Sequence, residues 1–372
     1  MADMPPASLL TPSSARPLAV ANWLLTICAM IFVIVIVGGI TRLTESGLSI
    51  TEWRPISGAL FPMSEEAWQR EFDLYRQIPE YQQINKGMSL AEFQFIYLWE
   101  WFHRQLGRLI GLVALGGFAW FLLKKAMPGG YRWRAASIFL LVCIQGAIGW
   151  WMVASGLSVR TDVSHLRLAV HLLTALFIFG WALWIALDLR TGGAERQRVP
   201  TLAIWAFAVL GLQLLFGAYV AGLNAGYAFN SWPLMGDEIY PSAAPWLEPA
   251  LRNLVDNPIT VQFVHRWLAF VVLAMAILLA IRVKRAGGRK ESLFLHGAVG
   301  VQILLGIWTL VSGVSFHVAV AHQGMATLVV AAFVVAAHKL AVAERLGSGA
   351  STSLGTNGIE KASLIPSTVE GR

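Results

Sequence analysis

Four histidines form two matched pairs near the ends of apolar segments that are long enough to cross a membrane. His103 is matched with His171 in the first half of the chain, and His265 with His322 in the second half. An ionisable residue inside a membrane costs about 2.5–3.5 kcal/mol on insertion scales and tends to persist where it has a partner. Four such residues at repeated depth therefore indicate two similar binding sites.

Two neutral imidazoles from facing helices, with no thiolate or carboxylate to complete a tetrahedral set, suit six-coordinate haem iron better than structural zinc. A planar haem can also fill the middle of a four-helix bundle. Any single histidine could equally be a hydrogen-bond donor between helices, so it is the duplication that favours haem. The predicted iron ligands are His103, His171, His265 and His322.

The two predicted sites differ by one ionisable group. Glu100 stands three residues before His103, whereas Gln262 occupies the equivalent place before His265. Residues three apart on a helix share a face, so each of these side chains is expected beside its histidine. A carboxylate can exchange a proton at ordinary pH and an amide cannot. The difference predicts a reactive site in the first half and a supporting site in the second.

Three arginines lie close in sequence to the predicted ligands: Arg104, Arg108 and Arg266. They could bind the propionate groups of haem through paired hydrogen bonds. The alternative is pairing within the protein, because Arg104 follows Glu100 by four residues and that spacing supports an ion pair on one helical face. The sequence leaves both interpretations open.

The elements that would position these residues are membrane-spanning helices. The 372-residue chain is 56% hydrophobic and only 13% charged, which is typical of a polytopic membrane protein. We predict an all-α fold with eight spans, because about 20 apolar residues cross a bilayer as a helix. The spans lie near 20–40, 95–122, 133–155, 165–187, 201–223, 259–281, 291–313 and 317–340.

The basic residues predict the orientation of the chain. They cluster in alternate short loops, which places those loops in the cytoplasm and argues against nucleic-acid binding despite the net charge of +7. Both termini then lie inside, and the histidines lie towards the periplasmic side of a bacterial inner membrane. The basic clusters are Lys124, Lys125, Arg132 and Arg134; Arg190, Arg196 and Arg198; and Arg282, Lys284, Arg285, Arg289 and Lys290.

Cys28 and Cys143 are the two cysteines, and each falls within an apolar span. No disulfide framework can therefore hold the outer loops together. We expect both to serve as small buried side chains.

An internal repeat divides the chain into halves. Gln145, Gly149, Trp151, Ser155 and Gly156 recur with identical spacing as Gln302, Gly306, Trp308, Ser312 and Gly313. Four spans per half give both halves the same orientation, which predicts two four-helix bundles related by a pseudo-twofold axis along the membrane normal. The expected parts are 1–193, 194–346 and a tail, 347–372, whose Ser, Thr and Gly content indicates disorder.

The glycines of this repeat are expected to let helices approach closely in lipid. Gly38 and Gly47 near the end of the first span match Gly217 and Gly226 near the end of the fifth, and Gly306 has its match in the third span. Small residues at helix interfaces commonly have this packing role in membranes.

The repeat leaves one ligand ambiguous. Without a gap it places His165 opposite His322, whereas a longer connection before the fourth span restores His171 as the match. Either histidine could then be the partner of His103.

Several motifs resemble the haem A synthase family, in the branch that lacks cysteine pairs in the outer loops. The resemblance covers about residues 20–340. Its motifs are Gly38-Gly39-Ile40-Thr41-Arg42-Leu43-Thr44, Ser46-Gly47-Leu48-Ser49, Glu52-Trp53-Arg54-Pro55, Glu100-Trp101-Phe102-His103-Arg104, Gly107-Arg108, Arg167-Leu168-Ala169-Val170-His171-Leu172, Asn230-Ser231-Trp232-Pro233-Leu234-Met235-Gly236, His265-Arg266 and His322-Gln323.

The resemblance implies an oxidoreductase that converts a ring methyl group of haem O into the formyl group of haem A, by successive hydroxylations, for cytochrome c oxidase. It implies that His103 and His171 bind the iron of the substrate haem O, which favours His171 over His165. It also implies that His265 and His322 bind a haem b cofactor and that Glu100 is catalytic. The implied partners are membrane lipid, haem O synthase and assembly factors of the oxidase, and a homo-oligomer is compatible with the sequence.

Two other classes of protein fit parts of the pattern. A two-haem electron-transfer cytochrome b would have similar histidines but would not need Glu100 at one site alone. A transporter built from a repeated bundle would explain the duplication and the buried charge, but not the paired histidines.

Overall fold

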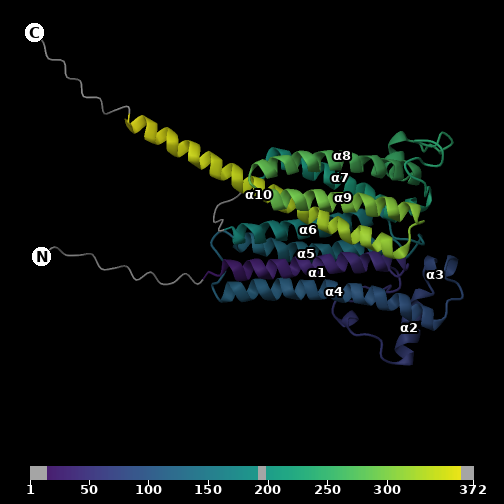
Figure 1. Cartoon of the computed structure of the whole chain (residues 1–372). Coiled ribbons are helices and arrows are strands. Elements are labelled where there is room, and N and C mark those ends of the chain that lie inside the picture. Colours follow the sequence, from purple (N-terminus) through teal and green to yellow (C-terminus); the bar gives the residue numbers. More distant parts are fainter. Residues whose placement is uncertain (1–14, 192–197, 362–372) are drawn as a thin grey trace, which may run out of the picture. The chain divides into compact units, whose positions relative to one another are not determined.

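The computed structural model describes residues 15–191 and 198–361, and within this part it contains helices and no strands. Eight helices have the length and composition needed to cross a membrane, the last over Phe316–Leu346, so the predicted all-α fold with eight spans is confirmed (Figure 1). They are α1 (Pro17–Leu43), α4 (Leu90–Leu123), α5 (Arg132–Val153), α6 (His165–Arg190), α7 (Thr201–Gly222), α8 (Pro258–Arg285), α9 (Arg289–Val311) and α10 (Phe316–Lys361).

The two helices that carry the motif His-Arg begin at polar caps. The Ser89 hydroxyl accepts a hydrogen bond from the Glu92 backbone N–H, and the Glu92 carboxylate accepts one from the Ser89 N–H, so α4 starts with a capping box. At α8 the Asn257 side chain accepts from the backbone N–H of Ile259. These caps satisfy backbone groups that the first helical turn leaves unpaired. As a result α4 begins five residues before its predicted span.

The connections after α1 and α7 contain short helices where the sequence predicts only loops. The first holds η1 (Ser57–Ala59), α2 (Glu65–Tyr75) and α3 (Pro79–Gln83), and the second holds η2 (Ala225–Tyr227) and η3 (Ala250–Leu254). Phe72 and Tyr75 of α2 are buried and pack against Phe93 of α4, with ring centroids 4.8 and 5.3 Å apart. The first connection is therefore a folded cap on the start of α4.

The described chain falls into two compact units. Unit one is Met1–Thr161 with Phe177–Ala194, and unit two is Asp162–Leu176 with Glu195–Arg372. The sequence predicts a boundary after residue 193, whereas the contacts group the beginning of α6 with the later helices. The two equivalent, symmetry-related halves thus stay a prediction from the repeat.

In unit one α1 packs on α4 and α4 packs on α5 (Figure 1). Gly117 of α4 lies so close to Trp23 of α1 that an added Cβ would be 2.0 Å from the indole Nε1, and that nitrogen donates to the Val113 carbonyl at 2.9 Å. Arg134 of α5 and the fully buried Asp188 of α6 form an ion pair at 2.7 Å. Small residues and paired polar groups hold these helices together, as expected in lipid.

In unit two α8 packs on α7, α9 and α10, and α10 also contacts α7 and α9. The helices that carry His265 and His322, α8 and α10, are therefore direct neighbours. The buried side chains of these two helices include the aliphatic Val272 and Leu279 and the aromatic Phe333.

The expectation for the two cysteines is right for one and wrong for the other. Cys28 is buried, and its thiol donates to the Phe179 carbonyl at 3.6 Å. Cys143 is exposed on α5. An apolar span leaves one face to the lipid, and hydropathy alone does not show which face a small apolar side chain occupies.

The last helix differs from the predicted disordered tail. It continues to Lys361, past residue 347 where the tail was expected to begin, and residues 362–372 lie outside the described part of the chain. A helix already under way gains one hydrogen bond for each residue added, which favours its continuation.

Candidate functional site

His103 lies against a glycine of the neighbouring helix. A Cβ added at Gly38 of α1 would be 3.2 Å from Nε2 of His103 on α4, closer than an ordinary van der Waals contact. The imidazole thus occupies space that exists because residue 38 has no side chain.

The histidines of unit two have the same surroundings. A Cβ at Gly217 of α7 would be 3.0 Å from Cε1 of His265, and a Cβ at Gly306 of α9 would be 2.9 Å from Cε1 of His322. Gly38 and Gly217 are counterparts in the repeat. The glycines predicted to bring helices together also make room for three of the four predicted iron ligands.

Two glutamines lie one helical turn before these glycines of unit two. Gln213 Nε2 is 3.2 Å from Nδ1 of His265 and also donates to the His265 carbonyl at 3.0 Å. Gln302 Nε2 is 3.5 Å from Nε2 of His322.

One imidazole nitrogen of this pair is available for a ligand. Nδ1 of His322 is buried and has no hydrogen-bond partner within the described chain. Buried polar atoms in native proteins almost always have a partner, and an unpaired one calls for an explanation such as a bound group. The residues present in unit two therefore fit a group that takes up imidazole nitrogen.

Sequence reasoning did not identify Gln213 as part of a site. A signal was present, because Gln213 is an isolated amide in the otherwise apolar α7 and its counterpart in the first half is Ile34. The two halves thus differ at this position as well as at the position of Glu100 and Gln262.

His165 has partners of its own at the start of α6. Its Nε2 is 3.4 Å from the Asp256 carboxylate, its ring meets that of Tyr219 edge to face at 5.7 Å, and a Cβ at Gly222 would be 2.6 Å from its Cβ. All four residues belong to unit two. His165 thus has partners within unit two, and the preference for His171 as a ligand stays a prediction.

The pairing of His103 with His171 stays a prediction. His171 lies on α6 within Asp162–Leu176, which belongs to unit two, whereas His103 belongs to unit one.

Glu100 is buried, with 3% of its surface exposed, and its Oε1 accepts a hydrogen bond from Nε of Arg104 at 2.7 Å. The ion pair that the spacing allowed is confirmed. The same guanidinium donates from Nη2 to the Ile50 carbonyl at 2.8 Å and from Nη1 to the Glu52 carbonyl at 3.2 Å. Arg104 therefore holds the first connection against the helix that carries His103.

Arg266 makes the corresponding contacts in the second half. Its Nη2 donates to the Phe229 carbonyl at 3.0 Å, and its Nη1 donates to the Ser231 carbonyl at 2.9 Å. Phe229 and Ser231 follow Ile50 and Glu52 by the same 179 residues that separate Gly38 from Gly217. The repeat thus extends to individual hydrogen bonds.

Within this shared framework the carboxylate and the amide behave differently. The Gln262 carbonyl oxygen accepts from Arg266 at 3.2 Å, and its amide nitrogen donates to the Phe229 carbonyl at 2.9 Å. The Glu100 carboxylate has no N–H with which to make the second bond. The first half thus has a group that can take up a proton where the second half has an amide fixed at both ends.

Arg108 also binds the first connection. It donates to the carbonyls of Pro55 at 2.9 Å and Arg54 at 3.1 Å, and to the Gln105 side chain at 3.1 Å. All three candidate arginines therefore have partners within the protein. Their contact with haem propionates stays a prediction.

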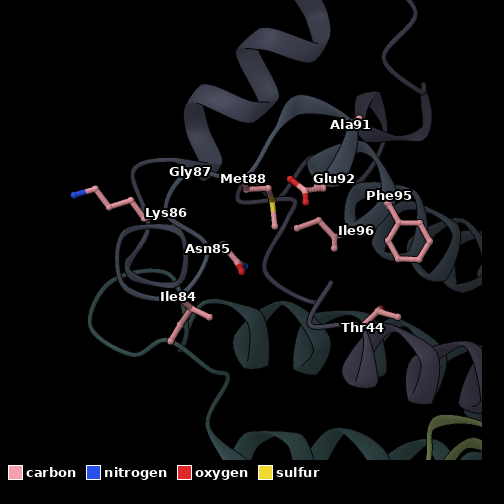
Figure 2. A pocket seen from close by; sticks show the side chains of 10 residues that line it. All are labelled: Thr44, Ile84, Asn85, Lys86, Gly87, Met88, Ala91, Glu92, Phe95 and Ile96. Atoms are coloured by element: carbon pink, nitrogen blue, oxygen red, sulfur yellow. The ribbon is translucent and has the colours of Figure 1, made fainter.

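A pocket of about 690 Å³ lies at the start of α4 and contains none of the four histidines (Figure 2). Ile96, one turn before Glu100 on α4, forms part of its wall, and Glu92 and Met88 project from the start of the same helix and the turn before it (Figure 2). The pocket is lined by Thr44, Ile84, Asn85, Lys86, Gly87, Met88, Ala91, Glu92, Phe95 and Ile96.

The donor groups favour haem over a bare metal ion. Throughout the part of the chain that the structure describes, no group of three or more His, Cys, Asp or Glu side chains is arranged to hold an ion. Two imidazoles are sufficient for haem, because the porphyrin supplies the other four nitrogens to the iron.

Fold and site together define a class of protein: a helical membrane protein with eight candidate spans and imidazoles set against glycines of neighbouring helices. The chain belongs to the family of cytochrome oxidase assembly proteins, COX15-CtaA, whose model matches residues 21–334. The resemblance inferred from the motifs is thereby confirmed.

Relatives over nearly the full length are named Heme A synthase. The protein from Sphingopyxis alaskensis is 51% identical over 342 residues, which cover 90% of this chain and 96% of the relative. The protein from Rhizorhabdus wittichii is 50% identical, with 88% and 95% covered, and that from Novosphingobium aromaticivorans is 46% identical, with 89% and 97% covered.

Proposed function

We propose that this chain has haem A synthase activity and oxidises a ring methyl group of haem O to the formyl group of haem A, which cytochrome c oxidase uses. The observation that carries the proposal is the presence of Glu100 in one half only, within a hydrogen-bond framework that the other half repeats with Gln262. The near-full-length similarity to proteins named Heme A synthase supports it.

In this proposal His103 and His171 bind the iron of the substrate haem O, and His265 and His322 bind a haem b cofactor. The room that Gly38, Gly217 and Gly306 leave beside three of these imidazoles supports the assignment. When bound, haem b supplies one-electron chemistry. The chain itself fixes the orientation of His265, because Gln213 contacts both the ring and the carbonyl of that residue.

The proposed chemistry follows from the two iron ligands. If His103 and His171 both bind the substrate iron, they leave no open position there for dioxygen, and water would supply the oxygen. Each round would join one water oxygen to the methyl carbon, release two protons, and pass two electrons to an electron acceptor outside this chain. A second round gives the hydrated aldehyde, which loses water to form the formyl group.

Glu100 is the proposed proton acceptor or water-positioning base. The guanidinium of Arg104 fixes one carboxylate oxygen and provides the opposite charge that a buried carboxylate needs. A positioned base of this kind typically contributes about 10²–10⁴-fold to the rate of a proton-transfer step.

The proposal also covers location. In it, both termini lie in the cytoplasm of a bacterial cell and the haem sites lie towards the periplasmic side of the inner membrane, an orientation that the basic loops favour. Haem O synthase and oxidase assembly factors are the proposed protein partners, alongside membrane lipid and further copies of the chain.

The test uses the full chain purified from cells that lack their own haem A synthesis. We expect a haem absorption spectrum and extracted pigments that include haem O or haem A beside protohaem. Glu100→Gln copies the second half into the first, so it should retain both haems and lower haem A formation about 100-fold or more. Glu65→Gln, which changes an exposed carboxylate on α2, is the control and should retain activity.

Two outcomes contradict the proposal. Normal haem A formation by Glu100→Gln would remove the assigned role of Glu100. Protohaem as the sole pigment in the unaltered protein would favour a two-haem electron-transfer cytochrome.

A further inference from the structure

An uncharged apolar segment lies exposed in the connection between α1 and α4. Residues 55–63 contain no charged side chain. Ile56, Leu60 and Met63 are 87%, 80% and 89% exposed. Large apolar side chains grouped at a protein surface commonly mark a site of contact with a protein or a membrane.

The segment is attached to one face of α4. The Gln105 side chain donates to the Ala59 carbonyl, and Arg108 donates to the Pro55 carbonyl at 2.9 Å. Gly58 allows the close approach, because a Cβ there would be 3.0 Å from the Arg108 guanidinium. The position of the segment along α4 is therefore fixed by residues 105 and 108.

The same face of α4 continues as apolar surface. Leu109 and Leu112 follow Gln105 at helical spacing and are exposed, Leu112 by 67%. In a membrane-spanning helix this exposed leucine stripe faces lipid. Segment 55–63 lies directly beyond it, so its exposed side chains continue a lipid-facing surface.

The length of α4 gives the depth of the segment. Its 34 residues extend about 51 Å, whereas a hydrocarbon core of about 30 Å needs about 20 residues. The helix α4 ends just before Lys124. About 20 residues counted back from this end reach about residue 104. Residues 105 and 108 therefore lie at the edge of the hydrocarbon core.

The length of α1 independently places the edge of the hydrocarbon core at the same level. About 20 residues counted from Pro17 reach about residue 37, and the next residue, Gly38, adjoins His103. Trp53, just before the segment, is half-exposed and stacks on Trp150 at 5.6 Å. Tryptophan is enriched at the boundary between membrane and water.

The backbone of the segment suits this depth. The N–H groups of Gly58, Ala59 and Leu60 donate to the carbonyls three or four residues before them. Pro55 and Pro62 have no N–H to satisfy. This partial pairing suits the edge of the hydrocarbon core and not its interior, where irregular backbone is not found exposed to lipid.

We propose that segment 55–63 inserts Ile56, Leu60 and Met63 into the adjacent leaflet, so that bilayer lipid is the partner of this surface. The segment thus anchors the first connection at the lipid boundary, beside the helix that carries Glu100 and His103. This anchoring follows from helix length, side-chain exposure and hydrogen bonds, and it is independent of the proposed activity.

The test measures the depth of a probe at residue 60. In a Cys143→Ser background, in which the remaining Cys28 is buried, Leu60→Cys is labelled with a small fluorophore and the protein is placed in phosphatidylcholine nanodiscs with brominated acyl chains. Leu112→Cys is the lipid-facing control and Arg70→Cys, exposed on α2, is the aqueous control. All variants change exposed side chains, and their haem content and thermal stability report folding.

We expect quenching at residue 60 within about twofold of that at residue 112 and at least about fivefold above that at residue 70. Reaction of Leu60→Cys with a charged, membrane-impermeant maleimide should be correspondingly slow. An unquenched label that reacts as fast as residue 70 would overturn the proposal. A label that is neither quenched nor reactive would also overturn it and would assign the surface to a second copy of the chain.

Discussion

At the scale of residues, the absence of a side chain on one helix sets the place of an imidazole on the next. Gly38, Gly217 and Gly306 each lie within about 3 Å of a histidine ring when a Cβ is added. Interiors are packed too densely to accept an extra methyl group at such distances without a shift of the ring or the helix. Each of these three histidine rings therefore depends on the facing glycine for the space that it occupies.

Gly306→Ala should weaken haem binding in unit two. The new Cβ would be 2.9 Å from Cε1 of His322, and overpacking of this kind costs about 1–3 kcal/mol, or about 5–150-fold in binding. Haem absorbance per protein is the measurement. Gly300→Ala on the same helix meets nothing within 4 Å and should leave it unchanged. Equal loss in both variants would show that α9 is simply intolerant of substitution.

Gln213→Leu should also lower haem retention in unit two, by about 10–100-fold, which is the usual cost of removing a group that orients an iron-binding histidine. The amide contacts both the ring and the carbonyl of His265. Competition with a haem-binding apoprotein measures the loss. Leu212→Met, an exposed change next to it, is the control. Full retention by Gln213→Leu would limit this residue to helix packing.

At the scale of elements, an arginine on each His-Arg helix holds the preceding connection in place. Arg104 binds Ile50 and Glu52, and Arg266 binds Phe229 and Ser231, through planar guanidinium groups that reach two carbonyls at once. A lysine ammonium is compact and cannot reproduce this geometry. The connections therefore derive their order from the helices beneath them.

Arg266→Lys should loosen the second connection while leaving α8 helical. We expect amide hydrogen exchange over 229–234 to become about tenfold faster. Local opening of this segment would no longer have to break the two hydrogen bonds from the arginine to its carbonyls. Hydrogen-exchange mass spectrometry provides the measurement. Arg252→Lys, which changes an exposed arginine paired with Asp256 at 3.0 Å, is the matched control. Unchanged exchange over 229–234 would show that other contacts hold this connection.

At the scale of the whole molecule, the chain repeats one framework, and two of the differences between the halves lie close to the predicted ligands. The first half has Glu100 and Ile34 where the second has Gln262 and Gln213. The first half thus has a carboxylate and an apolar side chain where the second has two amides, of which Gln213 contacts His265. In the proposed function this difference separates a reactive site from a site that retains a haem.

The basic loops predict how the whole chain lies in the membrane. Alkaline phosphatase fused within 124–131 should be inactive, because that loop is predicted to be cytoplasmic, whereas a fusion within 224–257 should be active in the periplasm. Activity is measured in intact cells against fusion protein level. The opposite pattern would reverse the proposed location of both haem sites.

The sequence by itself determined the eight spans, the paired histidines and the break in symmetry at Glu100. Spans can be read from sequence because each needs about 20 consecutive apolar residues, which is a local property. The Glu100–Arg104 ion pair was also predictable, because residues four apart share one helical face. Motifs within single segments were sufficient to indicate the family.

Only the tertiary structure decided which residues of separate helices meet. Contact of Gly306 with His322, of Gln213 with His265, and of His165 with Asp256 depends on how each helix is rotated and how far it slides along its neighbour. Apolar spans carry little of this information, because a face towards lipid and a face towards another helix have similar composition. For that reason Cys143 was wrongly expected to be buried, whereas its place within a span was predicted correctly.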